Sequence, residues 1–174
     1  MDGKRKPVVS VRELCVMALL TAILFLQEEL LTFLPNIQLT VFLILLYAKC
    51  LGFGKTLMIV TVYLLLDAAY MGSLNPYFTT GQWLGWMVNP LITCTLLKKT
   101  EEPLVLAGAA AGFAFLYSWI MILPTMWLLH VEFVPYLISD LPFEAILAAS
   151  SFLTTLLLYE PLRKLLPKLI GQTN

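Results

Sequence analysis

Apolar residues fill most of the chain, and prolines, glycines and charged residues interrupt them at only a few places. The interruptions leave six apolar segments, at about 11–33, 38–51, 55–71, 81–97, 103–129 and 138–163. Ser10 precedes the first segment as a possible helix cap, and the turn-forming residues 72–76 separate the third from the fourth. About 20 apolar residues suffice for one helical crossing of a bilayer. The pattern predicts six transmembrane helices in a single domain that covers residues 1–174.

The composition favours a membrane protein over a soluble one. Hydrophobic residues make up 60% of the chain and charged residues 13%, against roughly 45–50% and 25% in soluble domains. Mean hydropathy is +0.86. A soluble domain of this size needs a polar shell, which so few charges cannot supply. The 11 basic and 11 acidic residues cancel, so a nucleic-acid binder is excluded as well. We therefore expect an all-α integral membrane protein.

The distribution of the basic residues predicts the topology. They fall in four clusters: Lys4, Arg5, Lys6 and Arg12; Lys49 and Lys55; Lys98 and Lys99; and Arg163, Lys164 and Lys168. The stretches 13–48, 56–97 and 100–162 contain no Lys or Arg, and each is long enough for two crossings joined by an outside loop. Because cytoplasmic loops collect Lys and Arg, we expect six crossings with both termini in the cytoplasm.

Three acidic residues are candidates for function. Asp67 lies inside the third segment, and Asp140 and Glu144 are spaced i,i+4 on one face of the sixth. With a helix start at 138, Glu144 would lie roughly 6–9 Å along the helix. A buried acid costs about 2.5–3.5 kcal/mol at the bilayer centre, and no cation is expected on this side. The acids are therefore protonated, hydrogen-bonded within the protein, or paired with a ligand that supplies donors.

Further polar and aromatic residues on the outside complete the candidate binding site: Trp83, Trp86, His130, Tyr136 and Asn36. Each also has a simpler interpretation. Aromatic residues at helix ends form interfacial belts, and a lone histidine near an interface is more often hydrogen-bonded in a loop. The sequence shows no metal-ligand spacing, no nucleophile paired with a base and no nucleotide-binding loop. We expect no metal, no cofactor and no catalytic residue.

Small residues mark surfaces where helices can approach closely in lipid. Ala18 and Ala22 are spaced i,i+4 in the first segment, and Gly108 and Gly112 form a GxxxG pattern in the fifth. We expect the glycine pair to pack inside the bundle.

At this point the chain resembles the substrate-binding S components of energy-coupling factor (ECF) vitamin transporters. The resemblance rests on size, the six predicted helices and segments 12–22, 34–40, 65–72, 140–144 and 159–162. The segment 140–144, Asp-Leu-Pro-Phe-Glu, is similar to the family's Gly-x-Pro-Phe-Asp sequence. The chain departs from the family after this segment, with Leu147 and Ser150 or Ser151 where many relatives carry His and then Asn.

The resemblance implies a multi-pass protein of a bacterial or archaeal cell (inner) membrane. Such a protein binds a vitamin or precursor from outside, and its Ala18–Ala22 face docks on a transmembrane coupling subunit that carries two ATPase subunits. An outer face with acids and aromatic rings suits a flat, neutral or cationic ring, such as an aminopyrimidine or thiamine. The alternative is an MreD-like membrane scaffold, which would need no small-molecule substrate. A small membrane enzyme is a weaker alternative.

Overall fold

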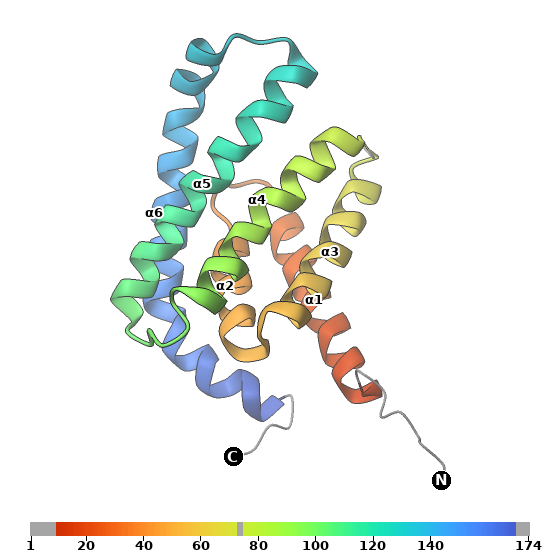
Figure 1. Ribbon diagram of the computed structural model, residues 1–174, viewed down its shortest axis with the longest axis vertical. Helices are drawn as coiled ribbons and strands as arrows, with labels where there is room; N and C mark the ends of the chain where they lie inside the picture. The colour runs from red at the N-terminus through yellow and green to blue at the C-terminus, as the bar shows by residue number, and fades with distance from the viewer. Residues whose placement is uncertain (1–9, 73–74, 170–174) are drawn as a thin grey trace.

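The computed structural model describes residues 10–72 and 75–169, and the regular structure in these residues is entirely helical (Figure 1). The helices are α1 (Val11–Leu31), α2 (Thr40–Leu51), α3 (Phe53–Tyr70), α4 (Pro76–Thr95), α5 (Pro103–Leu129) and α6 (Phe133–Leu169). The predicted all-α fold with six helices is confirmed. The basic residues Lys4, Arg5 and Lys6 lie outside the described residues, as do positions 73–74 of the predicted turn.

Four helices are long and apolar enough to cross a membrane, namely α1, α3, α5 and α6. The apolar helix α2 is shorter, with 12 residues. These helices and the composition indicate a membrane protein.

The short helix α2 lies at the centre of the bundle. It contacts each of the other five helices, and its residues 40–48 are all buried. Helices α5 and α6 form a long antiparallel pair that extends beyond α3 and α4 at the top of Figure 1. The hydrophobic core is therefore built around α2 and is closed on one side by the α5–α6 pair.

Two helices begin earlier than expected. Asn75 caps α4 by accepting hydrogen bonds from the backbone N–H groups of Tyr77 and Phe78, at 3.0 and 3.3 Å. Pro76 then occupies the first helical turn, where its missing N–H costs nothing. Helix α6 begins at Phe133, because Pro135 is tolerated in a first turn for the same reason. It also continues to Leu169, past the expected end at 163.

The GxxxG pattern in α5 does not pack inside the bundle, so that expectation was wrong. Gly108 and Gly112 are exposed, and a Cβ at either position would meet nothing within 4 Å. The close helix contact lies instead at Gly81 and Gly85 of α4. A Cβ on Gly85 would lie 2.8 Å from the Tyr117 ring of α5, and one on Gly81 would lie 2.6 Å from a proline of α5. These two glycines let the N-terminal half of α4 approach α5.

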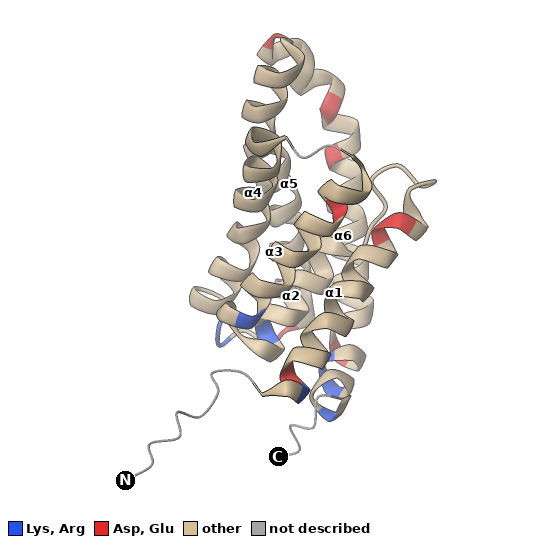
Figure 2. Cartoon of the chain, turned by 90° about the vertical axis from the view of Figure 1, so that its right-hand side faces the viewer, with Lys and Arg blue, Asp and Glu red and all other residues tan. Residues whose placement is uncertain are grey.

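The described Lys and Arg residues gather at one end of the bundle, as Figure 2 shows in blue. Here Lys49 pairs with Glu101 at 3.5 Å and Arg163 pairs with the same carboxylate at 2.9 Å. Lys55 pairs with Glu13 at 2.6 Å. We call this the cation end. It is the end at which α2 meets α3 and α4 meets α5.

Candidate functional site

The opposite end of the bundle carries acids without any described Lys or Arg (Figure 2). We call it the acid end. Its acidic residues are Glu28, Glu29, Asp67, Glu132, Asp140 and Glu144. Since no cation offsets them, each acid must be solvated, hydrogen-bonded or paired with something that the chain does not provide.

Glu144 is the most deeply buried of these acids. Its exposed fraction is 1%. Within the described residues neither of its carboxylate oxygens makes a hydrogen bond of ordinary geometry, although the Trp119 indole N–H of α5 is a neighbouring donor. It lies 11 residues after the start of α6 at Phe133, which corresponds to about 16 Å along the helix. The expected depth of 6–9 Å was therefore too small, because the helix begins earlier than the sequence suggested.

Tyr136, Asp140 and Glu144 follow one another at i,i+4 along α6, so they share one face of the helix. Tyr136 and Asp140 are half-buried, whereas Glu144 is fully buried. The exposure thus decreases from the mouth of the acid end toward the interior. The unpartnered carboxylate of Glu144 therefore lies on the same helix face as two residues that solvent partly reaches.

A second group of polar residues joins α1 to α3. The Tyr63 hydroxyl donates a hydrogen bond to the Glu28 carboxylate. Asp67 follows Tyr63 by one turn, lies one turn before the end of α3 and is 7% exposed. Tyr63 was not recognised from the sequence, although its i,i+4 spacing to Asp67 was a usable signal.

Trp86 and Tyr117 form an aromatic wall between α4 and α5. Their rings stack with centroids 3.9 Å apart and planes inclined by 21°. Trp86 is 2% exposed, and its indole N–H has no partner within the described residues. Tyr117 has Glu28, Asp67 and Tyr136 as titratable neighbours, so this wall lies near acids of α1 and α3 and near a tyrosine of α6. Tyr117 was missed because its position in an apolar segment gives no polar pattern.

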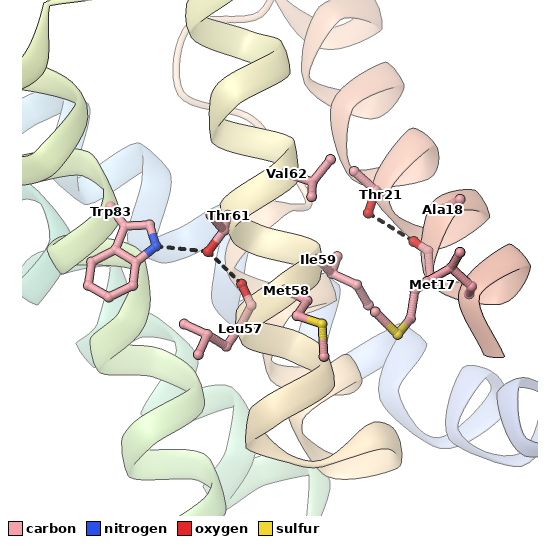
Figure 3. A pocket seen from close by; sticks show the side chains of 10 residues that line it. Met17, Ala18, Thr21, Leu57, Met58, Ile59, Thr61, Val62 and Trp83 are labelled. Carbon is pink, nitrogen blue, oxygen red and sulfur yellow. Dashed lines mark hydrogen bonds between the residues drawn. The ribbon is translucent and has the colours of Figure 1, made fainter. Parts of the chain in front are cut away.

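Two other predicted site residues lie apart from this group. Trp83 donates a hydrogen bond to the Thr61 hydroxyl at 2.9 Å. It lines a groove of about 600 Å³ between α1 and α3, whose other lining residues include Met17, Ala18 and Thr21 (Figure 3). His130 is exposed and ends α5 in the left-handed conformation, with φ of 52°.

Asn36 belongs to the loop between α1 and α2, which is fixed against its surroundings. The Gln27 side chain accepts from the Leu39 backbone N–H and donates to the Thr40 hydroxyl, both at 2.8 Å. The Ser150 hydroxyl of α6 donates to the Gln38 carbonyl at 3.3 Å. These bonds hold the loop next to α6, so half-buried Asn36 lies in a segment tied to the same helix as Glu144.

The two alanines of the predicted docking face are on the surface of α1. Ala18 is exposed and lines the groove between α1 and α3, and Ala22 is half-buried one turn later. The residues that line this groove include no charged side chain.

No grouping of three or more His, Cys, Asp or Glu side chains in the described part of the chain could hold a metal ion. In comparisons with protein-family models, curated proteins and solved structures, nothing matches this chain. The site must therefore be interpreted from its own chemistry.

Proposed function

We propose that this chain is the membrane-embedded, substrate-binding S component of an ECF-type importer for a vitamin or vitamin precursor. The observation that carries the proposal is the buried carboxylate of Glu144, which lacks a partner among the described residues. An unpartnered buried carboxylate is costly, and a ligand with N–H or O–H donors would offset the cost. The aromatic wall of Trp86 and Tyr117, which has Tyr136 of α6 as a neighbour, would favour a flat ring.

The substrate class follows from the charges of the acid end. Glu144, Asp140 and Asp67 repel an anion, and no described cation lies there to bind a carboxylate or phosphate. A neutral or cationic ring rich in donors, such as an aminopyrimidine or thiamine, fits this chemistry. The unpartnered Trp86 N–H adds one donor for an acceptor on the ligand.

The first experiment is native mass spectrometry of the purified protein, which would reveal a co-purified small molecule. The second is calorimetric titration of that molecule into wild type and E144Q. A charge-assisted hydrogen bond contributes roughly 1.5–3 kcal/mol, so affinity should fall about ten- to hundredfold in E144Q. E132Q is the matched control, because Glu132 is an exposed acid at the same end and should leave affinity unchanged.

The scaffold alternative makes the opposite prediction. An MreD-like protein would carry no stoichiometric small molecule, and E144Q would change neither ligand retention nor affinity. Either result would remove the main argument for a binding protein.

We further propose six crossings with both termini in the cytoplasm, supported by the gathering of Lys and Arg at one end. Cysteines introduced at the exposed residues Glu132 and Lys99, in a variant lacking the three native cysteines, test this topology. An impermeant reagent should label position 132 from outside and should not reach position 99. Labelling of position 99 from outside would contradict it.

The partner implied by this function is a transmembrane coupling subunit, which would bring two ATPase subunits. We place its docking surface at Ala18 and Ala22, since small residues allow a partner helix to approach closely. Leu at both positions should abolish co-purification with the coupling subunit while ligand binding survives. Leu at Ala145 and Ala149, two exposed alanines of α6 with the same spacing, is the control for added bulk. Normal assembly of the α1 variant would exclude this surface.

A further inference from the structure

Helix α6 carries a buried polar stripe that continues inward from the candidate site. The stripe consists of Glu144, Ser151, Thr155 and Tyr159, with exposed fractions of 1%, 0%, 0% and 0%. At 3.6 residues per turn, these positions fall within about 80° of the helix circumference. They span about 22 Å along the helix axis. The stripe therefore runs most of the way between the acid end and the cation end.

The polar atoms of this stripe lack partners within the described residues at three of its four positions. Both oxygens of Glu144, Oγ of Ser151 and Oγ1 of Thr155 are buried without a hydrogen bond. Buried polar groups in proteins are nearly always hydrogen-bonded. Internal water molecules are the usual partners where the chain offers none.

The neighbouring positions show that this is a property of the stripe and not of hydroxyl residues in α6. Ser150 donates to the Gln38 carbonyl at 3.3 Å. Thr154 donates to the Ser150 carbonyl at 2.7 Å. Ser150 precedes Ser151 and Thr154 precedes Thr155, so each pair has the same residue type, yet only the first residue of each pair has a hydrogen-bond partner within the described residues.

At the cation end the stripe meets a carboxylate that water can reach. The Tyr159 hydroxyl donates to Glu101 at 2.8 Å, and the Glu101 side chain is 44% exposed. At the acid end, Glu144 follows half-buried Asp140. The stripe thus has an ionisable group at each end and hydroxyl groups between them.

The other charges at this stripe lie at its cation end, where Arg163 of α6 lies 5.9 Å from the centre of the Tyr159 ring and pairs with Glu101 at 2.9 Å. Helix α6 packs against α5 and α2. Helix α5 contains no Asp, Glu, Lys, Arg or His, and the only charged residue of α2 is Lys49, which pairs with Glu101. The titratable groups nearest to Glu144 are Asp140 and Tyr136 on α6 itself.

We propose that this stripe is a proton path between Glu144 and Glu101. Water molecules bridge the hydroxyl groups of Ser151, Thr155 and Tyr159. Each oxygen accepts a proton from one neighbour and releases its own to the next, so a proton lost by one carboxylate is gained by the other. The slowest step lies between Glu144 and Ser151, where Leu147 and Ala148 occupy the buried face. This activity does not require a substrate, and it can therefore be tested separately from ligand binding.

The test measures proton movement in liposomes that contain the purified full chain and a trapped pH-sensitive dye. A pH step is applied, with valinomycin and potassium supplying the counter-ion movement. Wild type should equilibrate pH faster than protein-free liposomes. S151A and T155V should each slow the protein-dependent rate at least about tenfold, which corresponds to roughly 1.4 kcal/mol of added barrier.

The adjacent residues provide matched controls. S150A and T154V make the same chemical changes one position away, and they should leave the rate unchanged. The proposal fails if wild type is no faster than protein-free liposomes, or if the control variants slow the rate as much as the stripe variants do. Circular dichroism establishes that each variant is folded. If S151A or T155V does not fold, the proton rate of Y159F tests the proposal instead, because this variant keeps the ring and removes only the hydroxyl. An unchanged rate in Y159F would contradict the proposed proton path.

Discussion

Charged side chains have different partners at the cation end and at the acid end of the bundle. At the cation end, Lys49, Lys55 and Arg163 each pair with a glutamate, and Lys49 also donates to three backbone carbonyls. At the acid end, Glu144 is buried with no partner among the described residues. The charges of the first end stabilise the connections between helices. At the second end Glu28 accepts from Tyr63 and joins α1 to α3. Within the described residues no comparable bond accompanies the burial of Glu144, which is the reason to assign Glu144 a function.

The largest effect is expected at Lys49, whose side chain is 5% exposed. K49M removes the pair with Glu101. It also leaves the carbonyls of Leu97 and Thr100 without a donor, whereas in the wild type the Lys49 Nζ lies 2.9 and 2.5 Å from these two oxygens. Glu101 is 44% exposed and keeps Arg163 as a partner, so the main cost comes from the two part-buried carbonyls left without a donor, about 3 kcal/mol in all. Unfolding titrations in mixed detergent micelles should show this loss. K99M, at an exposed lysine, should change stability little, and a similarly small change in K49M would contradict the structural role of the cation end.

Helix packing near the acid end should tolerate added bulk less than helix packing near the cation end. G85A places a Cβ 2.8 Å from the Tyr117 ring, and overpacking of this kind typically costs 1–3 kcal/mol, or about 2 kcal/mol here. G108A adds the same atom where nothing lies within 4 Å. It should increase stability by roughly 0.5–1 kcal/mol, because alanine favours a helix over glycine. Thermal unfolding of both variants measures the difference, and equal effects would show that the two halves pack alike.

E144Q should leave the fold intact, in contrast to K49M. The carboxylate makes no hydrogen bond of ordinary geometry within the described residues, and Gln keeps an acceptor oxygen for the neighbouring Trp119 N–H. A neutral amide is also less costly to bury than a charge. We expect stability in the absence of ligand to be unchanged or raised by about 1 kcal/mol. The same unfolding titration applies. A loss above about 2 kcal/mol, the size expected when a buried hydrogen bond is broken, would mean that Glu144 supports the structure.

The smallest effect is expected at the pair between Lys55 and Glu13. Their side chains are 27% and 40% exposed, and exposed pairs contribute only a small amount to stability. K55M should lower stability by this amount at low salt, and the difference should disappear at high salt because ions screen the pair. A difference that persists in high salt would indicate that Lys55 acts through packing.

Much of the fold followed from the sequence because membrane helices are encoded locally. Apolar runs predicted all six helices, and the cap at Ser10 is confirmed by its hydrogen bond from the Glu13 backbone N–H at 3.2 Å. The errors were at boundaries where a proline could stand either in a loop or in a first turn. Residue type alone does not distinguish these cases, since a first-turn proline sacrifices no hydrogen bond.

The candidate site was predictable only in part. Asp140 and Glu144 were found because i,i+4 spacing places them on one face whatever surrounds the helix. Tyr117 and Tyr63 were missed because their importance comes from the helices opposite them. The same reason explains why Gly81 and Gly85 make the close helix contact and Gly108 and Gly112 do not. Both pairs form a GxxxG pattern, which permits close approach, but the neighbouring helix decides whether approach occurs.

The sequence by itself determined the helices, the apolar character and the separation of cations from acids, because these depend on residue type and on spacing along one chain. Only the tertiary structure decided that the short α2 lies at the centre, that Gly85 meets Tyr117, and that Glu144 is buried without a partner within the described residues. Burial and hydrogen bonding are properties of the space between helices. That space is filled by residues far apart in the sequence, and no local pattern specifies which of them meet.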